Sequence, residues 1–164
     1  MNGFATYNSP VGVLKISYTD TGITQIKRME TAEGGGVPSA LSDLAYSQLC
    51  EYFEGRRKCF ELPLELHGTD FQMRVWRALL AIPYGETRSY KDIAQSVGCP
   101  KGFRAVGMAN NKNPIAIVVP CHRVVGSDGS LVGYATGLDM KRWLLELEQN
   151  GHLAEQVHTP CQKV

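Results

Sequence analysis

The sequence predicts a small α/β N-terminal unit, made of a short antiparallel sheet and a helix, followed by a mainly α-helical C-terminal domain with a helix-turn-helix. Two observations predict this fold class. Apolar and polar residues alternate between residues 14 and 26, and later segments repeat apolar residues at helical spacing, most of them ending at glycine or proline. We expect the N-terminal unit to span residues 1–66, the helix-turn-helix domain residues 67–152, and a flexible tail residues 153–164.

The N-terminal unit is predicted from two alternating segments and one helical segment. The alternating segments contain Leu14, Ile16, Tyr18, Ile23 and Ile26. A turn signal at residues 20–22 separates them, which predicts an antiparallel hairpin. A helix that ends at Gly55 is predicted from Leu41, Leu44, Ala45, Leu49 and Phe53. Residues 60–66 alternate again, and Pro63 favours an edge strand there.

The second half begins with a helix that has a clear start signal. Thr69 and Gln72 have the spacing of a capping box, and Pro83 ends the helix. Its apolar face consists of Phe71, Val75, Trp76, Leu79 and Leu80. This helix is expected to pack against the segments that follow.

Two shorter helices are predicted next. Ser89 and Asp92 mark the start of the first, which buries Ile93, Ala94 and Val97 and stops at Gly98. A tight connection leads to a helix of mostly small residues over 103–109. Two short helices joined by a turn of about four residues have the outline of a helix-turn-helix, whose second helix enters a DNA groove. Any pair of antiparallel helices gives the same pattern, so this outline alone favours DNA binding weakly.

The last two elements are predicted on either side of glycine-rich loops. The continuous apolar run from Ile115 to Val119 is consistent with a buried strand that leads into residues 120–123. A final helix from about Asp139 to Asn150 is expected to stop at Gly151. It is expected to bury Met140, Trp143, Leu144 and Leu147.

The charge of the chain is unevenly distributed. Residues 1–66 hold six Lys/Arg against eight Asp/Glu, a balance of −2. Residues 71–123 hold eight Lys/Arg against two Asp/Glu, a balance of +6. A local excess of basic residues indicates either a solvated charged face or a nucleic-acid-binding surface.

The sequence argues against membrane insertion and against disulfides. No stretch approaches the roughly 18 apolar residues of a membrane-spanning helix, and residues 1–10 lack the pattern of a signal peptide. The five cysteines are odd in number and scattered, so neither a disulfide framework nor a zinc site is expected. His152, His158 and Cys161 have no standard ligand spacing. A cytoplasmic protein without metal or cofactor is therefore expected.

Cys121 is the candidate nucleophile. A cysteine after an apolar strand is more often a small core residue, but His122 and Arg123 follow it directly, and both favour formation of a thiolate. Neighbours on a strand point apart, so a bridging water is the natural link between thiol and imidazole. Glu148 is a candidate for the carboxylate that orients His122.

The run from Ile115 to Val124 closely resembles the PCHRV signature of the O6-alkylguanine-DNA alkyltransferases, also called methylated-DNA–protein-cysteine methyltransferases. Other segments follow the bacterial pattern in order. They are residues 68–72, 82–87, 89–90, 104–107, 113–114, 133–134 and 141–148. The resemblance is strong over residues 67–150, whereas the N-terminal unit matches only in outline.

The resemblance implies a reaction and a set of roles. Cys121 attacks the alkyl carbon and keeps the alkyl group, while His122, a water and Glu148 draw off the thiol proton. Tyr90 donates a hydrogen bond to N3 of the leaving guanine, and Asn113 holds the turn near the nucleophile. The guanine pocket includes the carbonyls of Cys121 and Val124, together with Tyr134 and the Ala135 amide.

The resemblance also implies how DNA is bound. Arg104 fills the gap left when the damaged nucleotide rotates out of the duplex. Further contacts to DNA are expected from Ser89, Tyr90, Ala105 and Arg123. The partner is double-stranded DNA that carries O6-alkylguanine, or O4-alkylthymine, and the protein is expected to act as a monomer.

Each of these residues also has a structural interpretation. Arg104 could contact a phosphate, Asn113 could be a turn residue before Pro114, and Glu148 could be a solvated carboxylate. The sequence departs from the family in two respects: it has no cysteine or histidine before Cys50 to hold the zinc of some members, and it has Ala135 where others carry serine. The alternative functions are a helix-turn-helix regulator or damage sensor without chemistry, and a thiol hydrolase with multiple turnovers.

Overall fold

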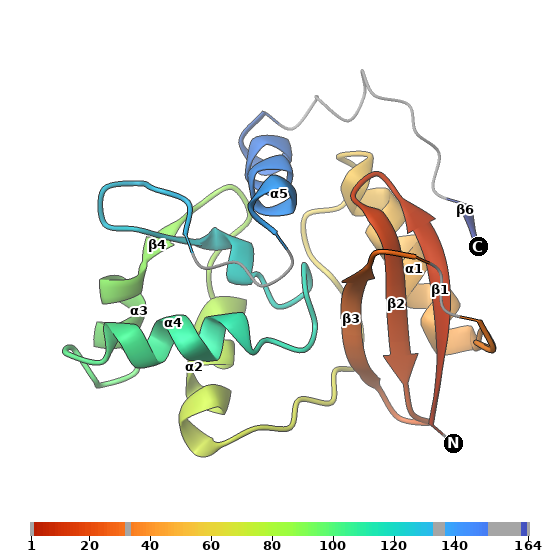
Figure 1. Cartoon of the computed structure of the whole chain (residues 1–164), viewed down its shortest axis with the longest axis horizontal. Coiled ribbons are helices and arrows are strands. Elements are labelled where there is room, and N and C mark those ends of the chain that lie inside the picture. The colour runs from red at the N-terminus through yellow and green to blue at the C-terminus, as the bar shows by residue number, and fades with distance from the viewer. Residues whose placement is uncertain (1, 32–33, 133–136, 151–161, 164) are drawn as a thin grey trace. The chain divides into compact units, whose positions relative to one another are not determined.

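The computed structural model describes residues 2–31, 34–132, 137–150 and 162–163. The chain forms two compact units, one of Met1–Glu65 with Asn150–Val164 and the other of Leu66–Gln149. Figure 1 shows the sheet of the first unit and the helices of the second. Among the described residues, no helix is long and apolar enough to cross a membrane.

The first unit is an antiparallel sheet with one helix packed on it. The strands are β1 (Gly3–Ser9), β2 (Gly12–Tyr18), β3 (Ile23–Met29) and β6 (Gln162–Lys163), in the order β3-β2-β1-β6. Helix α1 (Ala40–Phe53) contacts β1, β2 and β3 (Figure 1). The predicted hairpin is confirmed as β2 and β3, and the predicted helix as α1. Strands β1 and β6 were not predicted, and the rest of the predicted tail lies outside the described residues.

A β-bulge explains the spacing of the buried residues in β3. Ile23 and Ile26 are both buried, although residues three apart on a regular strand point to opposite faces. Tyr18 pairs with Ile23 and Ser17 pairs with Gln25, so Thr24 is an extra residue in the ladder. This extra residue brings Ile23 and Ile26 to the same face as Leu14.

The edge strand predicted over residues 60–66 is wrong. This segment forms only an isolated bridge, in which Ile23 donates to the Pro63 carbonyl at 2.8 Å and Glu65 donates to the Ile23 carbonyl at 2.8 Å. Proline has no N–H to extend a ladder. The alternation of apolar residues therefore reflects one-sided burial of an irregular segment.

The second unit contains four helices among the residues described. They are α2 (Asp70–Leu80), α3 (Tyr90–Ser96), α4 (Phe103–Asn111) and α5 (Leu138–Asn150). The capping box predicted at Thr69 and the helix start predicted at Ser89 are confirmed, and Ser89 also forms a capping box. Leu80 was expected on the apolar face of α2 but is 43% exposed, and Trp143 of α5 is only half-buried.

Helices α3 and α4 pack together in the outline of a helix-turn-helix (Figure 1). Their connection, residues 97–102, is longer than the expected turn of about four residues. Gly98 within it has a φ of +80°, a left-handed conformation that suits glycine. Ile93, Ala94 and Val97 are buried as predicted.

The strand predicted over Ile115–Val119 is also wrong. These residues are buried but form consecutive turns, in which Val118 donates to Ala116 and Val119 donates to Ile115. Ile117 has a φ of 73°, which a β-branched residue adopts only under strain. Turns lead into the short 3₁₀ helix η1 (Cys121–Arg123) and then into β5 (Val124–Val125), which pairs in parallel with β4 (Arg88–Ser89).

Candidate active site

Cys121 lies at the first position of η1, where the chain leaves the buried turns. It is 5% exposed, and its thiol sulfur is 3.1 Å from Nδ2 of Asn113. A sulfur that accepts a hydrogen bond from an amide is better able to carry negative charge. A reactant must therefore be brought to a buried, polarised thiol.

Two asparagines hold the backbone around the thiol. Asn113 Nδ2 also donates to the Val119 carbonyl at 2.8 Å, and Asn113 Oδ1 accepts from the Ile115 amide at 3.0 Å. Asn110, which is 2% exposed, donates from Nδ2 to the carbonyl of Cys121 at 3.3 Å. Asn113 was expected at this place from the resemblance, whereas Asn110 was not predicted.

A buried carboxylate joins the two residues that follow the thiol. Oε2 of Glu148 is 2.6 Å from Nε2 of His122, and Arg123 donates from Nε to Oε1 at 2.8 Å and from Nη2 to Oε2 at 3.0 Å. His122 is 0% exposed and Glu148 is 6% exposed. The expected pairing of His122 with Glu148 is thus present in the structure.

The environment sets the ionisation of this cluster. Burial acts to raise the pKa of the Glu148 carboxyl, but hydrogen bonds from His122 and Arg123 and the positive charge of Arg123 outweigh it and lower the pKa to about 2. Burial lowers the pKa of His122, although Glu148 opposes that shift. At neutral pH a charged Glu148 therefore faces a neutral imidazole.

The tautomer of His122 follows from these partners. Because Nε2 faces a carboxylate, it carries the proton, and Nδ1 is left as the acceptor. Within the described part of the chain, Nδ1 is buried and has no hydrogen-bond partner. The imidazole next to Cys121 is therefore arranged to accept a proton.

Arg123 was expected to contact DNA, and the structure contradicts this. Its side chain is 8% exposed, and Nη1 donates to the Ile82 carbonyl at 2.7 Å while Nε and Nη2 bind Glu148. All three guanidinium nitrogens have partners inside the unit. A buried arginine held in this way orients the carboxylate and is not available to a phosphate.

Tyr90 and Lys141 converge on the same backbone carbonyl. The hydroxyl of Tyr90, the first residue of α3, donates to Val132 O at 2.8 Å, and Lys141 Nζ donates to Val132 O at 3.0 Å and to Val124 O at 2.6 Å. Burial raises the pKa of Tyr90, and negative charge on Cys121 raises it further. Burial lowers the pKa of Lys141 to about 8.

Lys141 was missed at the level of sequence, although a signal was present. Lys141, Leu144 and Glu148 are spaced i, i+3 and i+7, so they lie on one stripe of α5, and all three are buried. A lysine on the buried stripe of a helix needs a polar partner inside the protein. Here the partners are carbonyls of the active-site loop.

The other residues predicted to bind DNA or to line the guanine pocket differ in their exposure and in their partners. Arg104 and Ala105 are exposed on α4, and Ser89 is half-buried, with its side chain capping α3. The Val124 carbonyl, expected in the guanine pocket, accepts from Lys141, and a carbonyl has a second lone pair for another donor. Tyr134 and Ala135 lie outside the described residues.

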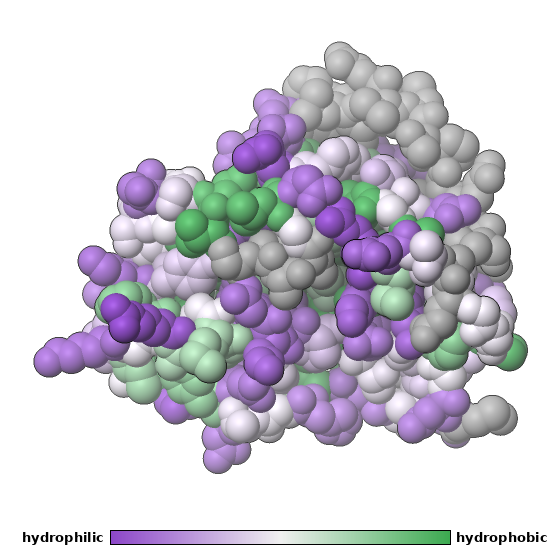
Figure 2. Space-filling view, viewed as in Figure 1, coloured by the Kyte–Doolittle hydropathy of each residue, from purple (hydrophilic) through white to green (hydrophobic). Residues whose placement is uncertain are grey.

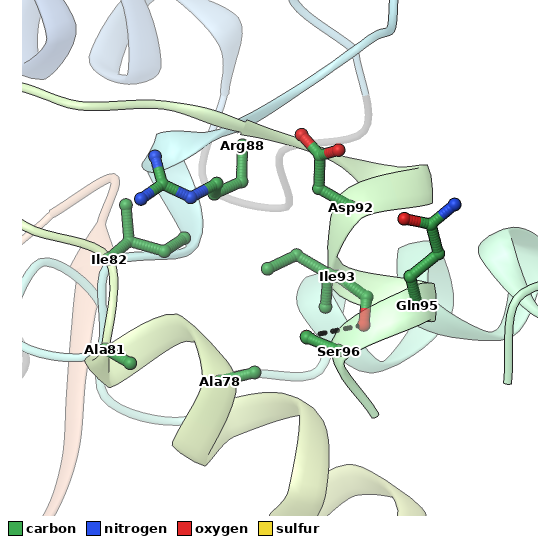
Figure 3. Close-up of a pocket in the computed structure, with 8 residues that line it drawn as sticks. All are labelled: Ala78, Ala81, Ile82, Arg88, Asp92, Ile93, Gln95 and Ser96. Carbon is green, nitrogen blue, oxygen red and sulfur yellow. Dashed lines mark hydrogen bonds between the residues drawn. The ribbon is translucent and has the colours of Figure 1, made fainter. Parts of the chain in front are cut away.

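Two hollows open on the surface of this unit. One, of about 350 Å³, is lined by Tyr90, Lys91, Phe103, Gly107, Asn111, Ser127 and Val132. The other, of about 580 Å³, lies between the end of α2 and α3, where Figure 3 shows Arg88 and Asp92 near Ile82 and Ile93. The first hollow contains Tyr90 from the predicted site, and the second contains none of the predicted site residues.

In the part of the chain that the structure describes, no group of three or more His, Cys, Asp or Glu side chains is placed to hold a metal. His152, His158 and Cys161 lie outside that part. The described cysteines, Cys50, Cys59, Cys99 and Cys121, are thiols.

Known proteins with similar sequences and structures share both units. The model of the 6-O-methylguanine DNA methyltransferase DNA-binding domain matches residues 70–150, and that of the ribonuclease-like domain of the same proteins matches residues 3–66. The methylated-DNA–protein-cysteine methyltransferase of Methanosarcina barkeri is 49% identical over 148 residues, which are 87% of this chain and 94% of the relative. The methylated-DNA–protein-cysteine methyltransferase of Mycobacterium tuberculosis is 49% identical over 153 residues, which are 90% of this chain and 92% of the relative.

Solved structures give the same result. The O6-methylguanine methyltransferase of Mycobacterium tuberculosis superposes with a TM-score of 0.84 at 46% identity, covering 92% of this chain and 94% of the other. The structure of the Mycobacterium tuberculosis protein in complex with DNA gives a TM-score of 0.84 at 48% identity, and the match covers 90% of this chain and 93% of the other.

Proposed function

The chain belongs to the 6-O-methylguanine DNA methyltransferase family, and from this premise we propose that Cys121 is the residue that receives the alkyl group. The protein binds DNA and repairs it directly, by moving the alkyl group of O6-methylguanine onto one of its own cysteines. The observation that best supports Cys121 is its position beside Asn113 and the His122–Glu148 pair. Exposed Cys59 has no comparable surroundings.

The proposed reaction is a single displacement. The Cys121 thiol gives its proton to Nδ1 of His122 through a water, and the thiolate attacks the alkyl carbon in line with the C–O6 bond. The C–S bond forms as the C–O6 bond breaks, and the electron pair stays on the guanine. The Tyr90 hydroxyl donates to N3 and so stabilises the departing base. A thioether offers water no leaving group, so each molecule reacts once.

The buried position of Cys121 requires that the damaged base leave the duplex. Extrusion of a nucleotide costs a few kcal/mol, and Arg104, exposed on α4, is proposed to occupy the vacated space. Ser89 and Ala105 are proposed to contact the backbone of double-stranded DNA. We further propose that the protein acts as a monomer in the cytoplasm, where thiols stay reduced.

The mass of the intact protein tests this proposal. After incubation with excess duplex that contains O6-methylguanine, the wild-type chain should gain one methyl group, and peptide mapping should place it on Cys121. Cys121→Ser should gain nothing yet still bind the duplex, and Cys59→Ser should react like wild type. Tight binding with unchanged wild-type mass would indicate a damage sensor. Repair that continues beyond one equivalent would indicate a hydrolase.

A further inference from the structure

An exposed aromatic side chain lies at the mouth of the smaller hollow. Phe103 is the first residue of α4 and is 42% exposed. Its ring has no stacking partner within the described residues. Figure 2 shows pale green, apolar surface over α4, bordered by hydrophilic side chains. Covering this ring with a ligand would remove apolar surface from water and so favour binding.

The hollow is built from three segments of the second unit. Phe103, Gly107 and Asn111 line it from one stripe of α4, because they are spaced four residues apart. Tyr90 and Lys91 line it from the start of α3. A Cβ added to Gly107 would lie 3.8 Å from the Tyr90 ring, so the glycine leaves the tyrosine face open beside the helix.

The hollow shares two residues with the site around Cys121. Tyr90 lines the hollow, and so does Val132, whose carbonyl accepts from the Tyr90 hydroxyl at 2.8 Å. The Val132 carbonyl, which also borders the hollow, is held by Lys141 together with Tyr90. A molecule in the hollow would thus lie against the residues that surround Cys121.

The chemistry of the lining points to a nucleotide. A volume of about 350 Å³ is in the range of pockets that hold small molecules. The Phe103 ring suits the face of a base, the Tyr90 hydroxyl suits its edge, and the exposed ammonium of Lys91 suits its phosphate. Since the chain binds DNA and its thiol is buried, the occupant with this chemistry is the nucleotide that leaves the duplex.

From these observations we propose that Phe103 packs its ring against the base of the extruded alkylguanine when that base lies in the hollow beside Tyr90. Phe103 is then a substrate-binding residue that favours the extrahelical base. This proposal rests on the proposed function. It differs from the role of Arg104, which acts on the duplex that the base leaves behind.

Two substrates separate these roles: a duplex and a five-nucleotide single strand, each with one O6-methylguanine. Single-turnover rates are measured as a function of protein concentration. Phe103→Ala should raise the half-saturating concentration about tenfold on both substrates, as expected for loss of a base–aromatic contact. Phe103→Trp should restore it. Arg104→Ala should impair the duplex reaction far more than the single-strand reaction.

Met108→Ala is the matched control, because Met108 is apolar, 67% exposed and on α4, but does not line the hollow. It should behave like wild type on both substrates. Phe103→Ala kinetics that match wild type would overturn the proposal, and so would a defect confined to the duplex, which would make Phe103 a groove contact. If wild type itself failed to methylate Cys121, the proposed function would fail instead.

Discussion

Glu148 determines how its neighbours are ionised. The Arg123 guanidinium binds both carboxylate oxygens and so favours the charged form of the carboxyl. The charged oxygen holds the proton of His122 on Nε2 and leaves Nδ1 facing the side where no described residue donates. One buried carboxylate therefore supports both the fold of the loop and the direction of proton transfer.

We predict that Glu148→Gln lowers the free energy of unfolding by about 3 kcal/mol at pH 7, the value of a pKa depressed from 4.5 to about 2. Because folding depresses the pKa of Glu148, its charged carboxylate stabilises the folded state at every pH above the unfolded pKa. This stabilisation is lost as the pH falls through the folded pKa. Urea unfolding of wild type and variant should therefore differ fully above about pH 4.5 and converge toward about pH 2.

The exposed pair of Arg88 with Glu86 provides the control. Its N–O distance is 3.1 Å, but the Glu86 side chain is 53% exposed, so Glu86→Gln should change the stability very little. A stability difference between wild type and Glu148→Gln that ignores pH would mean that the amide disturbs packing and that the charge contributes nothing.

Single residues were predictable where a motif fixed them. Cys121, His122 and Glu148 were all assigned from order and spacing, and the structure places His122 against Glu148. Burial was not predictable in this way. Arg123 looked like a surface cation because a motif carries no information on solvent exposure, and Lys141 and Asn110 were missed because their partners are backbone carbonyls.

The start of α3 connects secondary structure to chemistry. Ser89 Oγ accepts from the Asp92 amide at 3.0 Å, and Tyr90 is the next residue. The cap fixes where the helix begins and therefore where the Tyr90 ring is placed. Ser89 was also expected to contact DNA, and its side chain is hydrogen-bonded to the Asp92 carboxylate within the cap.

We predict that Ser89→Ala destabilises the protein by about 1 kcal/mol, the usual value of a lost N-cap. Ser89→Asn and Ser89→Asp should both restore the stability, because each side chain can cap. Only Ser89→Asp should weaken DNA binding, since its carboxylate repels the phosphate. Urea unfolding and DNA titration measure the two effects. Equal affinity of the Asn and Asp variants for DNA would remove Ser89 from the interface.

Elements were predicted where capping and periodicity agreed. Helices α2 and α3 carry capping boxes that can be read directly from the sequence. Two strands were predicted wrongly, over 60–66 and 115–119, because an apolar pattern reports burial and leaves backbone conformation open. Ile117, with its φ of 73°, adopts a conformation that local preference disfavours and that its buried surroundings impose.

The whole molecule acts on a substrate that must be deformed first. Arg104 is exposed on α4, one residue beyond Phe103, in the basic half of the chain. If Arg104 fills the vacated stack, its contribution depends on whether a duplex has been opened. A phosphate contact contributes on single and double strands alike.

We predict that Arg104→Ala slows the reaction roughly 10- to 100-fold on duplex O6-methylguanine, less on single strands, and scarcely at all on free O6-benzylguanine. Single-turnover rates at saturating protein measure this. The salt dependence of duplex affinity should keep nearly its wild-type slope. If the salt dependence instead fell by about one phosphate contact, and the rate fell equally on single- and double-stranded DNA, Arg104 would be a phosphate contact.

The carbonyl of Val132 has two donors, the hydroxyl of Tyr90 and the ammonium of Lys141. In the proposed reaction guanine N3 arrives as a competing acceptor, and the hydroxyl can turn to it while Lys141 still donates to the carbonyl. No buried oxygen is left without a partner during this exchange, so the penalty of an unsatisfied acceptor does not arise. The tyrosine is thus exchangeable between protein and substrate, and entry of the base trades one hydrogen bond for an equivalent one.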